Sequence, residues 1–467
     1  MAIKFGTDGW RAVIADEYTF ENVKKISAAT AKAFRDHPKL SKGIIIGYDT
    51  RFLSKEFAEC SAVVFAANGI KVYLTDSFVT TPTVSLITRD KDLAYGVMIT
   101  SSHNPAKYNG YKLKDEYGGS MGTDLLKNVE KALNNVDKLS LEAGSLDSFL
   151  QEGKIEYING KEYYIKNLKE KININSITSS GVKIIYDAMY GSGQGMMDSL
   201  VNITALRSEI NPSFAGTSPE PVEKNLSLIE TEMKRGHYDI GIVTDGDADR
   251  IAILNEKGEF INPQETFALL LTYLIENKKM TGGVVRGFSS SQLIEKICEV
   301  NNLKLYTVPI GFKYISELMV KEDILIGAEE SGGIGLKNHL PERDGIFNGL
   351  LFCEMLSLRQ KKLSDLIKDI ESKYGKYFYK RIDKQLRDNS MKNIIMEKAK
   401  KIDDVAGMKV VKKDNLDGCK LFFENGWLLM RPSGTEPLLR LYTETYNIDK
   451  TDMILGEILK KLSLNNK

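Results

Sequence analysis

The sequence is poor in the residues from which disulfide frameworks and zinc sites are built. It contains 4 cysteines and 4 histidines in 467 residues. The cysteines are widely separated and form no CxxC pair, which argues against a structural zinc site and against a disulfide framework. We expect all of them to be core thiols. They are Cys60, Cys298, Cys353 and Cys419.

An excess of charge of one sign and long apolar runs are also missing. Lys and Arg number 64 against 63 Asp and Glu, so no global positive field attracts nucleic acid or an anionic membrane. No apolar run approaches the roughly 18 residues of a membrane helix, and the N-terminus lacks the apolar region of a secretory signal. These absences predict a soluble, cytoplasmic protein that binds small molecules, as a monomer or a homodimer.

What the chain does contain is a regular alternation of short apolar runs with helical patterns. Residues 43–48, 70–75 and 95–100 read as strands, and residues 55–68 as a helix between the first two. This rhythm predicts α/β units with mixed, largely parallel sheets. The same kind of strand is predicted at residues 181–187, 239–244, 283–287 and 304–308.

The length and the 42% content of hydrophobic residues predict several cores, and hence several domains. After Tyr374 the pattern changes to charged helical segments, such as residues 393–405, and to two apolar runs at 427–430 and 438–442. We therefore expect three related α/β domains followed by a smaller C-terminal α+β domain. Their predicted bounds are 1–155, 156–258, 259–373 and 374–467.

Polar loops follow the predicted strands, where ligand loops lie in open α/β sheets. The first, Thr-Ser-Ser-His-Asn-Pro at residues 100–105, offers a serine hydroxyl. A free serine is a weak nucleophile, so its use requires activation or prior phosphorylation. Because Ser, Asn and Pro also favour turns for backbone reasons, a simple strand-ending turn is the alternative interpretation.

The second loop carries three alternating carboxylates, Asp245, Asp247 and Asp249. Gly246 permits a tight turn, so the carboxylates can converge on a hard divalent cation such as Mg²⁺. An aspartate nucleophile of the haloacid-dehalogenase type also places Asp-x-Asp after an apolar strand. A sugar phosphatase with that mechanism is therefore an alternative hypothesis.

Two further loops suit a sugar phosphate. The segment 329–333, Glu-Glu-Ser-Gly-Gly, places carboxylates and a hydroxyl beside flexible backbone, which suits adjacent sugar hydroxyls. The segment 431–437, Arg-Pro-Ser-Gly-Thr-Glu-Pro, supplies a guanidinium, two hydroxyls and backbone donors, as needed to hold a phosphate dianion. An exposed glycine-rich loop and a tight surface turn are the alternative interpretations.

The joint occurrence of these loops, in this order, resembles the α-D-phosphohexomutases, the phosphoglucomutase and phosphomannomutase superfamily. The resemblance implies that Ser102 is the phosphorylated residue, with Ser101 as the fallback, and that the three aspartates and Ser102 bind magnesium. It also implies catalytic roles for four neighbours. His103 orients or stabilises, Lys112 is an acid or base candidate, Arg11 faces phosphate or handles protons, and Arg250 lies close to the transferring phosphate.

The same resemblance implies which residues bind substrate. Glu329, Glu330 and Ser331 bracket the 3- and 4-hydroxyls of the sugar. Lys313 matches a weaker motif, and His339 belongs to a stretch with Arg343, Asp344 and Gly345 that looks more like glucose-phosphate mutases. The fourth loop grips the non-reacting phosphate, through Arg431, Ser433, Gly434 and Thr435.

The resemblance implies an isomerase that interconverts hexose 1-phosphate and hexose 6-phosphate. A hexose 1,6-bisphosphate is the implied intermediate and activator, and glucose is the preferred sugar, with mannose second. Mannose- and glucosamine-type relatives tend to have Met or Gln in place of Glu330 and His in place of Gly333. Phosphoglucosamine mutase and a non-catalytic sugar-phosphate sensor remain alternatives.

Overall fold

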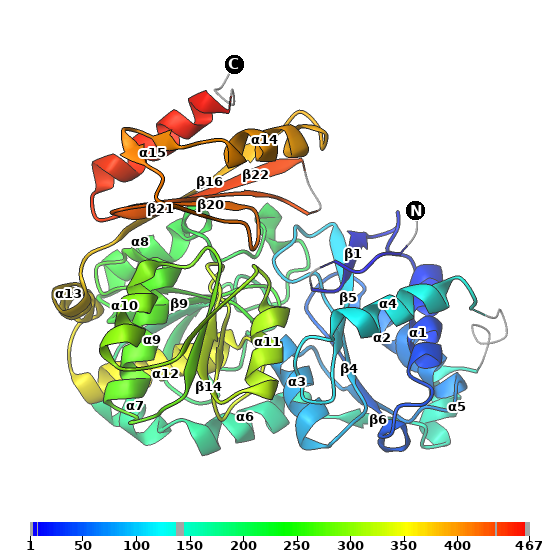
Figure 1. The fold of residues 1–467 in the computed structure, drawn as a ribbon. Helices are drawn as coiled ribbons and strands as arrows, with labels where there is room; N and C mark the ends of the chain where they lie inside the picture. The colour runs from blue at the N-terminus through cyan, green and yellow to red at the C-terminus, as the bar shows by residue number, and fades with distance from the viewer. Residues whose placement is uncertain (1–2, 7, 137–143, 435–436, 463–467) are drawn as a thin grey trace. The chain divides into compact units, whose positions relative to one another are not determined.

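The computed structural model describes residues 3–6, 8–136, 144–434 and 437–462. The chain forms two compact units. The first comprises Met1–Gly283 and Gly311–Leu366, and the second comprises Val284–Ile310 and Ile367–Lys467. Figure 1 shows the succession of helices and strands along the chain.

The first unit begins with a six-stranded mixed sheet. Its central strands β4, β2, β3 and β6 pair in parallel, whereas β5 and β1 pair antiparallel at one edge. In spatial order the strands are β1 (Trp10–Val13), β5 (Tyr108–Lys114), β4 (Gly96–Ile99), β2 (Ile44–Tyr48), β3 (Val72–Thr75) and β6 (Ile155–Ile158).

Both faces of this sheet are buried, which explains its continuous apolar strands. In β2, Ile44 and Ile46 belong to one apolar cluster, whereas Ile45 between them belongs to another on the opposite face. The helices α1 (Phe20–Ala33), α2 (Ser54–Ala67) and α4 (Thr123–Leu133) pack together (Figure 1), and α3 (Thr81–Asp90) packs with α6 (Gly160–Lys171). The short helix α5 (Leu146–Gln151) contacts α2.

A second sheet in the first unit repeats this plan. Its strands β8, β7 and β9 pair in parallel, and β10 and β11 continue antiparallel. In spatial order they are β11 (Phe260–Ile261), β10 (Ile251–Leu254), β9 (Ile240–Thr244), β7 (Ile184–Asp187) and β8 (Ile203–Leu206). The helices of this region are α7 (Ile174–Ser180), α8 (Ser227–Gly236) and α9 (Pro263–Glu276).

The rest of the first unit is built on the antiparallel pair β14 (Ile324–Ala328) and β15 (Ile334–Leu336). Helix α11 (Phe312–Lys321) packs on β14, and α12 (Gly345–Arg359) packs on β9 and β10. Asp344 caps the start of α12 by accepting the N–H of Phe347. Helix α13 (Leu363–Tyr374) contains the boundary with the second unit.

The second unit holds the parallel pair β12 (Gly283–Gly287) and β13 (Leu305–Val308), with α10 (Gln292–Val300) between them in sequence. Its main sheet is antiparallel, and α14 (Met391–Lys400) and α15 (Ile448–Lys461) cover an apolar cluster on it. The strands of this sheet, in spatial order, are β16 (Phe378–Gln385), β22 (Leu438–Thr445), β21 (Gly426–Pro432), β20 (Cys419–Phe423) and β19 (Lys412–Asp414).

The predicted fold class is confirmed: mixed α/β sheets come first and a smaller antiparallel sheet with helices comes last. One element differs. The expected helix at residues 393–405 ends at Lys400, and the hairpin β17 (Asp404–Val405) and β18 (Met408–Lys409) follows, because Ala406 and Gly407 adopt left-handed conformations that turn the chain. The four cysteines are free thiols, and no described helix is long and apolar enough to cross a membrane.

Candidate active site

The serine loop leaves the carboxyl end of β4 and turns sharply at Ser102, which has a left-handed backbone with φ of 51°. Its Oγ donates to Asp245 Oδ2 at 2.7 Å and lies 3.2 Å from His103 Nδ1. The buried Oγ of the neighbouring Ser101 has no hydrogen-bond partner among the described residues. The geometry therefore favours Ser102 over Ser101 as the reacting hydroxyl.

The acidic loop leaves the carboxyl end of β9 and is held by backbone bonds to its neighbours. The N–H of Thr81 donates to the carbonyl of Asp247 at 3.0 Å, and the N–H of Gly345 donates to the carbonyl of Ala248 at 3.0 Å. The serine loop is equally close, because a Cβ added to Gly246 would lie 2.4 Å from the carbonyl oxygen of Ser102. The backbone thus places the carboxylates beside the serine.

The sugar-loop candidate follows β14 and also reaches the acidic loop. The N–H of Ile251, directly after Arg250, donates to the carbonyl of Gly332 at 3.0 Å. Gly332 has φ of 83°, and a Cβ there would lie 2.3 Å from the carbonyl oxygen of Ile251, so this approach requires glycine. Glu329 is 9% exposed, and burial raises its pKa to about 7, although the nearby Arg343 opposes this shift.

Lys112 lies at the centre of the buried charges. Its Nζ is 2.8 Å from Asp247 Oδ2, 3.1 Å from Asp249 Oδ2 and 2.8 Å from Asp8 Oδ2. Burial alone would lower the pKa of Lys112, but these carboxylates outweigh it and hold the pKa above its ordinary value. Lys112 is therefore a permanent cation.

His103 has the opposite character. Burial, together with the guanidinium groups of Arg250 and Arg11, holds the pKa of His103 well below its ordinary value. The ring beside Ser102 Oγ is therefore neutral and has a nitrogen available for a proton. Arg250 follows the acidic loop, and its buried Nε has no hydrogen-bond partner among the described residues.

The acidic loop fits a divalent cation. One carboxylate oxygen from each of Asp245, Asp247 and Asp249 lies within 4.8 Å of the others. The buried Oδ1 atoms of Asp247 and Asp249 have no hydrogen-bond partner among the described residues. Burial and the neighbouring carboxylates also raise the pKa of Asp245 well above its ordinary value. Oxygen ligands of this kind suit Mg²⁺.

Two residues that carry this charge network were missed as site candidates. Arg343 Nη2 lies 2.6 Å from Asp249 Oδ2 and 2.9 Å from Asp8 Oδ2. Gly333 makes room for it, because a Cβ there would lie 2.3 Å from Arg343 Cδ. Asp8 lies three residues before the candidate Arg11, and that proximity was the available signal. Arg11 itself binds Asn104 Oδ1 at 2.8 Å.

Two predicted substrate residues lie outside this network. Lys313 Nζ is 3.2 Å from Thr123 Oγ1. His339 is buried, with Nε2 2.7 Å from Asp344 Oδ2 and Nδ1 3.4 Å from Lys171 Nζ. Both ring nitrogens thus have partners within the protein, and Asp344 in turn caps the start of α12. Substrate binding by His339 stays a prediction.

The predicted phosphate loop belongs to the second unit. Arg431 lies in the half-buried end of β21, and its Nε binds both carboxylate oxygens of Asp417 at 3.0 and 2.9 Å. The N–H of Ser433 donates to the carbonyl of Leu438 at 2.8 Å, which closes the turn to β22, and Gly434 is exposed. Thr435 lies outside the described residues.

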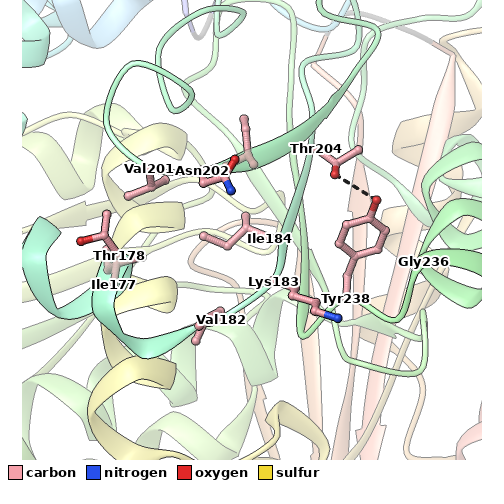
Figure 2. A pocket seen from close by; sticks show the side chains of 12 residues that line it. Ile177, Thr178, Val182, Lys183, Ile184, Val201, Asn202, Thr204, Gly236 and Tyr238 are labelled. Atoms are coloured by element: carbon pink, nitrogen blue, oxygen red, sulfur yellow. Dashed lines mark hydrogen bonds between the residues drawn. The ribbon is translucent and has the colours of Figure 1, made fainter.

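A separate hollow of about 440 Å³ lies by the amino ends of β7 and β8 and contains none of the candidate site residues. Figure 2 shows apolar side chains such as Ile184 on its wall, with the hydroxyl of Tyr238 bonded to Thr204 Oγ1 at 2.9 Å. These two hydroxyls satisfy each other, and we assign no ligand to the hollow.

The buried serine, the acidic loop and the cations around them define a phosphoryl-transfer enzyme, and the order of the domains identifies its kind. Models of the phosphoglucomutase/phosphomannomutase α/β/α domains I, II and III match residues 2–140, 162–258 and 262–374, and the model of the C-terminal domain matches 391–461. The chain therefore belongs to the phosphoglucomutase/phosphomannomutase family, within the α-D-phosphohexomutase superfamily. It is a phosphohexomutase, an isomerase.

Similar proteins carry several names within this superfamily. A phosphoglucomutase of Komagataeibacter xylinus is 28% identical over 95% of this chain and 87% of its own. A phosphoglucosamine mutase of Methanococcus aeolicus is 30% identical over 98% of this chain and 96% of its own. A crystal structure of a protein from Thermus thermophilus, assigned as a phosphomannomutase, has a TM-score of 0.86 at 30% identity and covers 99% of both chains. The comparisons thus leave the sugar open.

Proposed function

We propose that this phosphohexomutase interconverts glucose 1-phosphate and glucose 6-phosphate, with mannose phosphates as second substrates. Phospho-Ser102 and an enzyme-bound hexose 1,6-bisphosphate are the proposed intermediates. The observation that carries this proposal is the 2.7 Å contact between Ser102 Oγ and Asp245 Oδ2 of the acidic loop. We propose the domain bounds 1–155, 156–258, 259–373 and 374–467 for this enzyme.

In the first half-reaction, the free hydroxyl oxygen of the bound sugar phosphate attacks the phosphorus of phospho-Ser102. A new P–O bond to the sugar forms, and the P–O bond to Ser102 breaks. The sugar hydroxyl loses a proton and Ser102 Oγ regains one. Neutral His103, 3.2 Å from Ser102 Oγ, is placed to accept the serine proton when Ser102 Oγ attacks in the return step, and the resulting imidazolium can give that proton back when the P–O bond to Ser102 breaks. The second half-reaction reverses these steps with the other phosphate of the bisphosphate.

Lys112 takes an electrostatic role in this scheme instead of the base role. Its ammonium is held protonated by Asp8, Asp247 and Asp249, so it stabilises negative charge and orients the carboxylates. Arg250, with an unpaired buried Nε, supplies a planar donor for the transferring phosphoryl group. Asp245, Asp247, Asp249 and an oxygen of phospho-Ser102 would hold Mg²⁺, which supplies Lewis-acid stabilisation of that group.

Substrate positioning falls to the two remaining loops. Glu329, Glu330 and Ser331 follow β14, next to the acidic loop, and we assign them to the sugar hydroxyls. Lys313 is retained as a weaker candidate. The non-reacting phosphate is assigned to Arg431, Ser433, Gly434 and Thr435. Since the bisphosphate reorients between the half-reactions, this second loop must recognise phosphate in both orientations.

Phosphoglucosamine mutase is the second candidate function, supported by the 30% identity to the Methanococcus aeolicus protein. The preference for glucose rests on Glu330 and on Gly333, where glucosamine-type relatives tend to have other side chains. In this chain the space beside Gly333 is filled by Arg343, since a Cβ at Gly333 would lie 2.3 Å from Arg343 Cδ. A histidine at 333 would have to displace that guanidinium.

The deciding experiment has two parts. The purified protein is assayed for turnover of glucose, mannose and glucosamine 1-phosphates, and its peptides are analysed by mass spectrometry for phosphoserine. We expect glucose 1-phosphate to be turned over fastest and the added phosphate to map to Ser102. Ser102→Ala should lose nearly all turnover, whereas Ser101→Ala is the matched control and should stay active. Turnover by Ser102→Ala, or release of free phosphate at the rate of substrate loss, would overturn the scheme.

A further inference from the structure

Arg51 is a buried arginine, and each of its five guanidinium N–H groups donates a hydrogen bond. Its side chain is 0% exposed, and it follows β2 at the same sheet edge as the serine loop. Nε donates to Asp49 Oδ2 at 3.1 Å. The other N–H groups donate to backbone carbonyls of the serine loop: Nη2 to Ser102 at 2.6 Å and Asn104 at 2.7 Å, and Nη1 to Pro105 at 3.0 Å and Tyr108 at 3.1 Å.

Asp49 extends this arrangement to the amide of the serine. Its Oδ2 accepts the Thr100 hydroxyl at 2.6 Å, and Thr100 Oγ1 in turn accepts the N–H of Ser102 at 2.9 Å. Its Oδ1 accepts from Ser54 Oγ at 2.7 Å and from the N–H of Arg51 at 3.0 Å. Both backbone groups of Ser102 are therefore fixed by one buried network, the carbonyl by Arg51 and the amide by Thr100.

This network opposes an unfavourable backbone conformation. Ser102 has φ of 51°, a left-handed backbone that is unfavourable for a residue other than glycine unless its surroundings hold it. That conformation directs Oγ to Asp245 at 2.7 Å. Relaxation of Ser102 to an ordinary conformation would swing Oγ away from the acidic loop.

We propose that Arg51, with Asp49 and Thr100, is a positioning clamp that holds Ser102 in its left-handed conformation and so fixes the phosphoryl group in line with the acidic loop. Arg51 donates to backbone carbonyls of the serine loop, and Thr100 accepts the backbone N–H of Ser102, so the clamp holds this loop through its backbone. The proposal rests on the assignment of Ser102 as the phosphorylated residue.

An arginine is needed at this position because five donors diverge from one rigid plane. A lysine has three donors on a single nitrogen and cannot reach Asp49 together with four carbonyls that lie on different sides of the guanidinium. Arg51→Lys therefore keeps the positive charge that compensates Asp49 while it removes most of the clamp. Thr100→Val is a second, nearly isosteric variant that breaks the clamp from the amide side.

The test measures kcat, KM and the rate at which glucose 1,6-bisphosphate phosphorylates Ser102, together with the melting temperature of each variant. We expect kcat and the phosphorylation rate to fall roughly 10- to 100-fold in both variants, as for a reacting group displaced by about 1 Å, with KM changed less than about threefold. Two matched controls remove comparable bonds elsewhere. Arg359→Lys alters an arginine bound to Glu276, and Thr88→Val removes a buried hydroxyl bonded to Val84.

The outcomes separate the clamp from the proposed function. Activity in Ser102→Ala, measured in parallel, would overturn the assignment of the nucleophile itself. If Ser102→Ala is inactive but Arg51→Lys and Thr100→Val keep kcat within twofold, the clamp alone is wrong. The clamp is also wrong if both controls lose kcat as much as the two variants do, because the loss would then report general destabilisation.

Discussion

Gly246 offers the sharpest test of how the serine and acidic loops fit together. A Cβ at this position would lie 2.4 Å from the carbonyl oxygen of Ser102 and 3.1 Å from Cγ of Pro219. Carbon and oxygen atoms normally stay about 3.3 Å apart, so Gly246→Ala must separate the two loops by about 1 Å. The carbonyl cannot yield easily, because it accepts a hydrogen bond of 2.6 Å from Nη2 of the buried Arg51.

A displacement of this size affects catalysis more than folding. Misplacing a reacting group by about 1 Å costs on the order of a hundredfold in rate, so we expect kcat of Gly246→Ala to fall about 100-fold. Overpacking of this kind costs roughly 1–3 kcal/mol of unfolding free energy, which leaves the variant folded. The assay is the conversion of glucose 1-phosphate to glucose 6-phosphate, run beside thermal unfolding.

The matched control is Gly456→Ala on α15, where an added Cβ meets nothing within 4 Å. Alanine in an exposed helix is more favourable than glycine by roughly 0.5–1 kcal/mol, so this control should melt slightly higher and keep full activity. The reasoning would be refuted by a Gly246→Ala enzyme with kcat within threefold of wild type, since the loops would then not be held as closely as the structure shows.

Three further predictions concern the metal, a buried lysine and the phosphate loop. Excess chelator should abolish turnover and Mg²⁺ should restore it, while Asp247→Asn should weaken Mg²⁺ binding at least about tenfold; full activity in chelator would contradict the site. Burial lowers the pKa of Lys420 from its ordinary value of 10.5 to about 7. Between these two pH values the folded protein therefore binds fewer protons than the unfolded chain. The stability of wild type relative to Lys420→Met should therefore rise with pH between 7 and 10.5 in denaturant titrations, and a flat difference would contradict the burial of charge. Arg431→Ala should lower kcat/KM roughly 10- to 100-fold and release bisphosphate into solution; unchanged kcat/KM in both directions would reduce the loop to a turn.

The strands could be predicted from the sequence because an apolar run and the polar loop that follows it are local signals. The strands expected at 43–48, 95–100 and 239–244 are confirmed as β2, β4 and β9; β2 and β9 begin one residue later than expected, and β4 is one residue shorter at each end. The loop residues Ser102 and Asp245 could be expected to meet, since both follow strands whose carboxyl ends hold ligand loops. In the structure Ser102 Oγ lies 2.7 Å from Asp245 Oδ2.

What sequence reasoning missed depends on contacts between distant segments. Arg343 joins Asp8 across 335 positions in the chain, and neither residue follows an apolar run in a way that marks a ligand loop. Arg51 binds backbone carbonyls, which every residue possesses, so no side-chain pattern records its partners. The partners of His339 were equally hidden, because the fold alone brings its ring to Asp344.

The charges of the site explain why phosphoserine and metal should bind as a pair. Asp245, Asp247 and Asp249 are buried, and the available cation Lys112 bonds only the latter two among them. Asp245 has the Ser102 hydroxyl as its side-chain donor, and burial with like charges raises its pKa well above the ordinary value. Phosphorylation of Ser102 adds roughly −1.5 to −2 charge beside this carboxylate, and a divalent cation such as Mg²⁺ offsets that charge at short range. The phosphorylated enzyme should therefore bind Mg²⁺ more tightly than the unphosphorylated one, and by linkage Mg²⁺ should favour the phosphorylated state by the same factor.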